Sequence, residues 1–371
     1  MTKKKVAPYK FDVVGFFLRP ENLKKAREDF KNGKITKDDL KKVEDQEITK
    51  LIKKEKESGL KFISDGEFRR SWWHYDFFWG LNGVEKYELE DANIIHFHGA
   101  SLRPEGVKIV GKITGKSHPF LEHFKFVKEF EDDEVAAKQT IPAPAQFLRN
   151  VYTQIGKEDS VYKDDQEFIE DVAKAYGQFF QEIYDLGCRN VQLDDCTWGA
   201  LVDEDSIREY EANGKNVDEL KKLYLEINNK AIENAPKDLN ITSHVCRGNY
   251  KSAWHFSGGY DKVADFLLAN EKVSAFYLEY DDERSGDFEA LAKIPADKKV
   301  VLGLVTSKRP ELEKKEDLKR RIEEASKYIA KENICISPQC GFSSTEEGNA
   351  LTEEDQWKKV ALCREVAEEV L

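Results

Sequence analysis

The chain has 371 residues, enough for one large α/β barrel with insertions or for two smaller domains. Its formal charge of −12 argues against nucleic acid or an anionic membrane surface as a partner, because both are negatively charged. A hydrophobic content of 40% excludes wholesale disorder, and the longest apolar runs are far shorter than the roughly 20 residues of a membrane span. No apolar signal core follows the basic N-terminus, so we predict a soluble, cytoplasmic protein.

The first third of the chain is predicted to hold two short strands, two helices and an insertion. Residues 11–15 and 60–64 have the pattern of β-strands, and the charged stretch 21–58 between them that of two helices, the second capped by Thr36. Residues 72–79 are rich in aromatic side chains and either roof a ligand site or belong to the core beneath the insertion. Residues 84–113 contain short β-like runs, which we interpret as an inserted hairpin region.

From residue 136 onward, strand-like and helical patterns alternate. Strands are predicted over 136–141, 190–193, 240–244, 273–279, 299–304 and 333–337, and helices over 166–186, 217–234, 259–269, 311–331 and 353–371. With the two earlier strands this makes eight, which indicates a parallel sheet closed into a (β/α)8 TIM barrel of one domain, residues 1–371, with an N-terminal helical extension. An open doubly wound sheet is the alternative, although no glycine-rich dinucleotide motif supports it.

Possible metal ligands lie where the late strands end. His244 and Cys246 close the fifth strand and face the same way, because strand side chains alternate. Glu279 ends the sixth strand and Cys340 follows the eighth, so in a parallel barrel all four side chains could converge on one face. One nitrogen, two sulfurs and one carboxylate suit tetrahedral Zn²⁺. The alternative is a core histidine with cysteines that act as small buried apolar residues.

His96 and His98 form a rival pair with the same strand-type spacing. No cysteine or acidic cluster with ligand spacing follows them nearby, so a partly exposed strand of the insertion is the better interpretation. The six cysteines of the chain are widely scattered, which favours reduced thiols or metal ligands over a disulfide framework.

Acidic side chains are predicted to surround the same barrel mouth. Asp65, Glu67, Asp194 and Asp195 all follow predicted strands. They could bind a cation or the ammonium group of a substrate, or they could cap the helices that follow. Gly15 ends the first strand, where backbone amides could receive a carboxylate or simply form a tight turn.

Taken together, these residues resemble the catalytic barrel of cobalamin-independent methionine synthase, especially the single-domain homologues. The resemblance extends over nearly the whole chain, from Val14 to Cys340. It implies a (β/α)8 barrel, a zinc site of His244, Cys246, Glu279 and Cys340, and transfer of a methyl group to homocysteine to give methionine.

The resemblance also implies how homocysteine is held. The matching positions are Gly15 with Phe16 for the carboxylate, and Glu67 and Asp194 for the ammonium group, with Asp194 also a candidate for proton transfer. Phe16 stands where the family usually has serine. The family's aspartate is commonly followed by Glu-Pro, and here Asp195 and Cys196 stand in those two positions, so the loop after Asp194 also departs from the family.

The methyl-donor side departs from the family pattern. Thr306 occupies the region of the family's proposed proton-donating histidine, Asn150 that of a tryptophan associated with folate, and Ala200 that of a glutamate. The donor is therefore 5-methyltetrahydrofolate or an activated compound such as a sulfonium or methyl-corrinoid. Another zinc-dependent thiol alkyl transferase or lyase, and a non-catalytic thiol-binding or zinc-binding homologue, are the alternatives. We expect small-molecule substrates and a monomer or homodimer.

Overall fold

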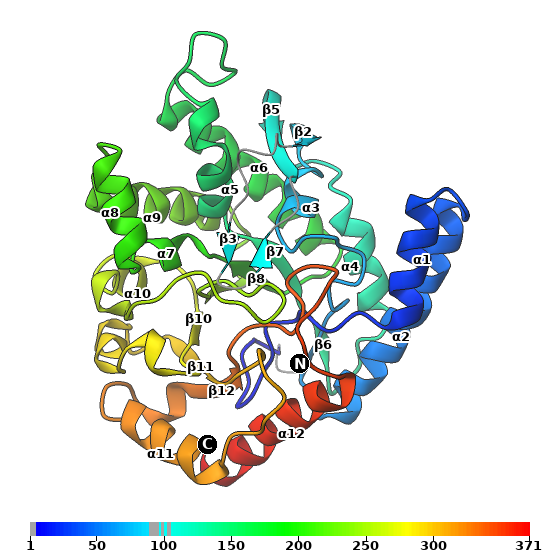
Figure 1. Ribbon diagram of the computed structural model, residues 1–371, viewed down its shortest axis with the longest axis vertical. Coiled ribbons are helices and arrows are strands. Elements are labelled where there is room, and N and C mark those ends of the chain that lie inside the picture. The colour runs from blue at the N-terminus through cyan, green and yellow to red at the C-terminus, as the bar shows by residue number, and fades with distance from the viewer. Residues whose placement is uncertain (1–4, 89–95, 98–99, 102–104) are drawn as a thin grey trace.

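A ring of parallel strands enclosed by helices forms the centre of the molecule (Figure 1). The computed structural model describes residues 5–88, 96–97, 100–101 and 105–371. The strands of the ring are β1 (Phe62–Ile63), β6 (Ala136–Ala137), β7 (Gln139–Pro142), β8 (Asn190–Asp194), β9 (Asn240–Val245), β10 (Ala275–Glu279), β11 (Lys299–Val305) and β12 (Ile334–Pro338).

Neighbouring strands of this ring pair in parallel. Six strands follow one another in the order β12-β11-β10-β9-β8-β7, and β1 pairs with β6. A parallel bridge from Phe11 to Ile336 joins the first segment of the chain to β12. The fold is the predicted (β/α)8 barrel. That residues 1–371 form a single domain remains a prediction.

Helices surround the barrel (Figure 1). The helical extension contains α1 (Glu21–Lys31) and α2 (Lys37–Glu57), and Thr36 forms a capping box with Asp39 at the start of α2, as the sequence predicted. The other helices are α3 (Tyr75–Phe78), α4 (Phe120–Lys128), α5 (Pro144–Val151), α6 (Asp165–Asp185), α7 (Thr197–Ala200), α8 (Glu204–Ala212), α9 (Val217–Glu233), α10 (Leu267–Asn270), α11 (Lys315–Ala325) and α12 (Glu353–Val370).

Two predicted strands differ from the structure, and Lys138 lies beside both of them. Among the described residues, the segment 11–15 joins the sheet through a single bridge at Phe11, and the amide of Val13 donates to Asp12 Oδ1 at 2.8 Å. The buried Lys138 donates to Asp12 Oδ1 at 3.2 Å and to the Val13 carbonyl at 2.6 Å. This inward-facing lysine lies where the predicted strand 136–141 divides into β6 and β7.

Two predicted helices are shorter than expected. In the predicted helix 259–269, residues Tyr260–Lys262 form a 3-10 turn and the α-helix begins only at Leu267, as α10. The Tyr260 hydroxyl donates to the Val245 carbonyl and accepts from the Glu279 amide, which fixes this segment against the barrel. Helix α11 covers only the middle of segment 311–331.

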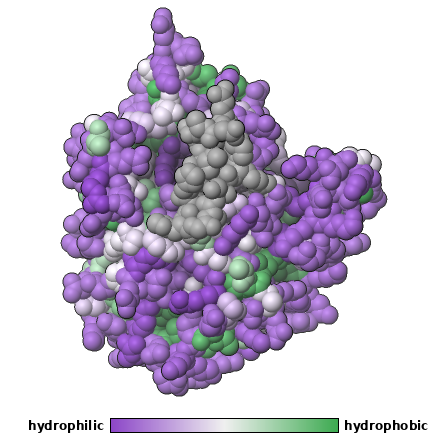
Figure 2. Space-filling view, in the orientation of Figure 1, coloured by the Kyte–Doolittle hydropathy of each residue, from purple (hydrophilic) through white to green (hydrophobic). Residues whose placement is uncertain are grey.

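The insertion forms a hairpin beside the barrel. Strands β2 (Asn82–Glu88) and β5 (Glu105–Thr114) pair antiparallel, and β3 (His96–Phe97) pairs with β4 (Ala100–Ser101). His98 lies outside the described residues, so the alternative histidine pair is not tested. The face of the molecule in Figure 2 is mostly hydrophilic, with small hydrophobic patches. Among the described residues, no helix has the length and apolar character needed to cross a membrane.

Candidate metal centre and its cavity

Three predicted metal ligands meet at the carboxyl ends of two strands. His244 is in β9, Cys246 follows β9 directly, and Cys340 follows β12. One ligand atom from each lies within 4.8 Å of those of the other two, and all three residues are buried. The barrel thus brings together side chains that are far apart in the sequence.

His244 is oriented by a carboxylate. Its Nδ1 lies 3.0 Å from Asp194 Oδ1, and the same oxygen accepts a hydrogen bond from Gln192 Nε2 at 2.8 Å. The other ring nitrogen, Nε2, is buried and has no hydrogen-bond partner in the part of the chain that the structure describes. Metal-binding histidines typically show this arrangement, in which a carboxylate fixes one nitrogen and leaves the other for the metal.

The two thiols also suit a metal. Hydrogen bonding to a neighbouring cysteine and burial raise the pKa of both Cys246 and Cys340 well above the ordinary value. Without a cation they are therefore uncharged, whereas Zn²⁺ binds the thiolate form and displaces the proton. An orphaned imidazole nitrogen beside two buried sulfurs is a donor set that fits zinc.

Glu279, the fourth predicted ligand, lies outside this group of three. Its Oε2 accepts from the Arg247 amide at 3.0 Å, and its Oε1 lies 2.9 Å from Arg284 and 3.6 Å from Lys308. Burial alone would raise the pKa of Glu279, but Lys308, Arg247 and Arg284 outweigh that effect and lower it to about 2. The carboxylate is therefore ionised and is already paired with the side chains of Arg284 and Lys308.

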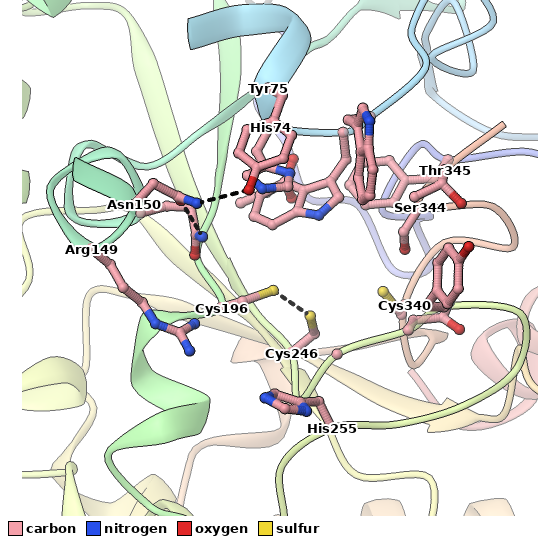
Figure 3. A pocket seen from close by; sticks show the side chains of 18 of the residues that line it. His74, Tyr75, Arg149, Asn150, Cys196, Cys246, His255, Cys340, Ser344 and Thr345 are labelled. Carbon is pink, nitrogen blue, oxygen red and sulfur yellow. Dashed lines mark hydrogen bonds between the residues drawn. The ribbon is translucent and has the colours of Figure 1, made fainter. Parts of the chain in front are cut away.

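A cysteine absent from the predicted ligands lies at the same place. Cys196 Sγ is 2.9 Å from Cys246 Sγ, and Figure 3 shows both sulfurs directed toward each other. The signal in the sequence was a scarce residue type two positions after Asp194, which we interpreted only as a departure from the family.

A cavity of about 310 Å³ opens above the sulfurs. Its lining includes Asp194, Cys196, His244, Cys246 and Cys340. The aromatic side chains in its walls are Phe16, Trp72, Trp73, Tyr75, Tyr87, Tyr250 and Phe256, together with the imidazoles of His74 and His255. Both interpretations of the segment 72–79 hold in part, because residues 72–75 line this cavity while Phe77 and Phe78 are buried in the core.

Of the four predicted substrate-binding residues, two line the cavity and two do not. Phe16 and Asp194 line the cavity, and Asp194 Oδ2 has no partner among the described residues. Gly15 and Glu67 are not in the lining. The buried Glu67 is ion-paired with Arg70 and accepts a hydrogen bond from Thr140 Oγ1 at 2.7 Å through the same oxygen, Oε1. Burial, the first of several causes, raises the pKa of Glu67 to about 8.

Arg149 and Asn150 form part of the opposite wall. The Arg149 guanidinium lies 5.2 Å from the centre of the Phe256 ring and, among the described residues, has no carboxylate within ion-pair distance. Asn150 donates to the Tyr75 hydroxyl at 3.3 Å (Figure 3). Thr306 lies outside the lining, and its amide donates to Glu313.

A family model for the catalytic domain of cobalamin-independent synthases matches residues 11–368. The chain belongs to the cobalamin-independent methionine synthase family. YxjG of Bacillus subtilis, itself uncharacterised, is 44% identical over 99% of this chain and 96% of its own length. Methionine synthase of Pyrococcus abyssi is 24% identical over 89% of this chain and 85% of its own length.

Solved structures share the fold of this methionine synthase family member. A Listeria monocytogenes protein assigned as a vitamin-B12 independent methionine synthase has 36% identity and a TM-score of 0.78, with 99% of each chain covered. A B12-independent methionine synthase from Shewanella, in complex with selenomethionine, has 18% identity and a TM-score of 0.70, with 98% of each chain covered. The second match supports the fold alone. The family and the barrel predicted from the sequence are confirmed.

Proposed function

We propose that this protein is a zinc-dependent methyltransferase that moves a methyl group to the thiol of homocysteine and forms methionine. The observation that carries the proposal is the orphaned Nε2 of His244 beside the thiols of Cys246 and Cys340 at a cavity. Membership of the family supports methyl transfer. The acceptor, homocysteine, is the one that the family resemblance implies.

His244 through Nε2, and Cys246 and Cys340 through Sγ, are the residues that would hold the ion. When bound, zinc lowers the pKa of a coordinated substrate thiol, so that a nucleophilic thiolate is available at neutral pH. Glu279 remains the fourth ligand implied by the resemblance, although its carboxylate is paired with Arg284.

Asp194 has two roles in this proposal. Its Oδ1 orients His244, and its Oδ2 has no described partner and belongs to a residue of the cavity lining. We propose that Oδ2 binds the ammonium group of homocysteine and accepts the proton that the substrate thiol releases. Glu67, with Gly15 and Phe16, remains a predicted substrate contact.

The methyl donor decides whether an acid is needed. The leaving nitrogen of 5-methyltetrahydrofolate requires protonation, whereas a sulfonium or methyl-corrinoid carries an activated methyl group. Burial lowers the pKa of His74 to about 3, so this imidazole is neutral at pH 7 and cannot act as the acid. His255 is the other histidine of the lining outside the metal group, and we assign it the proton if folate is the donor.

Turnover tests this function directly. The zinc-loaded protein is incubated with homocysteine and, separately, 5-methyltetrahydrofolate, methylcobalamin or S-methylmethionine, and methionine is measured by mass spectrometry. A His255→Gln variant should lose folate-dependent turnover and keep turnover with an activated donor. Homocysteine binding without methionine from any donor would favour the non-catalytic alternative, and methylation of a different thiol would favour another alkyl transferase. Cytoplasmic location and a monomer or homodimer remain predictions.

A further inference from the structure

The wall opposite the metal centre carries a positive charge without a counter-ion. Arg149 belongs to α5 and lines the cavity (Figure 3), and its guanidinium lies 5.2 Å from the centre of the Phe256 ring. In the part of the chain that the structure describes, no aspartate or glutamate oxygen lies within ion-pair distance of it. Burial alone would lower the pKa of Arg149, but Tyr210, Tyr224 and Cys196 outweigh that effect and raise it. The side chain is therefore a cation.

Arginines that follow two other strands of the barrel are paired with carboxylates. Arg70 binds Glu67, and Arg284 lies 2.9 Å from Glu279. A charge that is removed from water loses its hydration, so it is stable only where an opposite charge or hydrogen bonds replace the water. Arg149 is partly buried, and an anionic group bound in the cavity would give it the partner that Arg70 and Arg284 already have.

A buried amide of the same helix is also unsatisfied. Gln146 lines the cavity one turn before Asn150, and its Nε2 donates to Asn150 Oδ1 at 2.9 Å. Only 4% of Gln146 is exposed, and its Oε1 has no hydrogen-bond partner among the described residues. A buried acceptor without a donor is unfavourable, whereas a polar ligand would satisfy it. One charged and one neutral group of α5 therefore point to a bound molecule at this wall.

The charges of the two walls determine where an anionic group can bind. On the metal wall, Asp194 Oδ2 has no described partner and faces the ammonium group of homocysteine in the proposed function. A carboxylate repels an anion and a guanidinium attracts it, so an anionic group is stable at Arg149 and not beside Asp194. Homocysteine places its thiol at the metal and its carboxylate near Gly15 and Phe16 in the same proposal. The anion at Arg149 then belongs to the second substrate, the methyl donor.

We propose, on the basis of the methyltransferase function proposed above, that the methyl donor is an anionic compound and that Arg149 binds its carboxylate or phosphate group. Arg149 thereby determines donor specificity, since a planar guanidinium binds either oxyanion through two parallel hydrogen bonds. The carboxylates of 5-methyltetrahydrofolate and S-methylmethionine and the phosphate of methylcobalamin are groups of this kind. A donor without an anionic group, such as trimethylsulfonium, should be used poorly.

Binding of small anions tests the assignment without turnover. The zinc-loaded protein is saturated with homocysteine and titrated calorimetrically with benzoate, phenyl phosphate or the uncharged benzamide. At least one anion should bind about tenfold more tightly than benzamide, and the preferred anion distinguishes a carboxylate from a phosphate. Arg149→Met should lose this preference, and Arg149→Lys, which keeps the charge, should retain part of it. Equal binding of all three probes by the wild-type protein, or an unchanged preference in Arg149→Met, would overturn the proposal.

Labelling of the wild-type protein decides the question even if a variant does not fold. Phenylglyoxal modifies accessible guanidinium groups, and the modified peptides are quantified by mass spectrometry. The preferred anion should slow the labelling of Arg149 and leave that of Arg189 unchanged. Arg189 is a matched control because its guanidinium also lies on an aromatic ring, 3.8 Å from the centre of Tyr184, but outside the cavity. Equal protection of the two arginines, or of neither, would count against Arg149.

Kinetics separate this inference from the proposed function. With the donor that gives turnover, Arg149→Met should raise the KM of the donor about tenfold and leave the KM of homocysteine unchanged. An unchanged donor KM, or a raised KM for homocysteine, would remove Arg149 as the donor site and leave methyl transfer intact. Absence of methionine from every donor, with anions still bound through Arg149, would instead refute the proposed function and leave the anion site.

Discussion

Two walls of the same cavity are built in different ways. The metal wall comes from the ends of β8, β9 and β12, where Gln192, Asp194 and His244 form a continuous chain of hydrogen bonds. The wall that we call aromatic comes from the segment after β1, whose rings pack on one another with 3.9 Å between the centres of His74 and Tyr75. Beside it, α5 supplies the polar side chains of Arg149 and Asn150. The resemblance predicted the metal ligands His244, Cys246 and Cys340 of the first wall, whereas it predicted departures from the family on the donor side. Strand ends therefore hold the ligands of the proposed metal site, whereas the other wall is built from segments outside the barrel strands.

The largest effect should come from removing a sulfur of the metal wall. Cys340→Ser is expected to lose zinc and more than about 100-fold in methionine formation, because even an outer residue of a metal site contributes 10–100-fold. Zinc content after gel filtration and initial rates measure both effects. Cys188→Ala, at a buried cysteine outside the cavity, is the control and should keep its zinc. Full zinc content in Cys340→Ser would contradict the ligand assignment.

Asp194→Asn should have the next largest effect. The variant keeps the shape of the side chain but removes the charge that orients His244, so zinc affinity or activity should fall about 10–100-fold. The KM for homocysteine should also rise if Oδ2 binds its ammonium group. Competition with a zinc chelator and steady-state kinetics measure these effects. Asp203→Asn, at the start of α8, is the matched control. Equal behaviour of the two variants would remove Asp194 from the site.

Through His74, the aromatic wall should make the unfolding free energy of the protein depend on pH. The pKa of His74 in the folded protein, about 3, lies below its unfolded value near 6.5, because burial disfavours the charged ring. Its contribution is thus complete above pH 6.5 and is lost as the pH falls toward 3. Between pH 6.5 and 5.0, the wild-type protein should lose about 1.5 kcal/mol more unfolding free energy than His74→Phe. Urea unfolding measures this difference, and parallel stability curves would show that His74 titrates normally.

The smallest effect should separate the two walls most cleanly. Tyr75→Phe removes only the hydroxyl to which Asn150 donates, at a cost of about 1 kcal/mol or about fivefold in the KM of the donor. Zinc content and the KM for homocysteine should not change. Tyr328→Phe, on the exposed surface, controls for the substitution itself. A changed zinc content in Tyr75→Phe would mean that the walls do not act separately.

Local features of the sequence determined much of the fold. Helix α2 begins where Thr36 and Asp39 cap it, and the alternation of strands and helices predicts the barrel, because caps and periodicity depend on residues close along the chain. The His244 and Cys246 pair was predictable for the same reason, since two residues at strand spacing share a face.

Only the tertiary structure decided which partners those side chains have. Cys196 meets Cys246 across 50 positions, and Glu279 is bound by Lys308 and Arg284 instead of joining the group of three. Lys138 reaches Asp12 across 126 positions, next to the point where a predicted strand divides. Such contacts depend on how the closed barrel aligns its strand ends and on the cost of leaving a buried charge unpaired, and neither quantity is present in a local pattern.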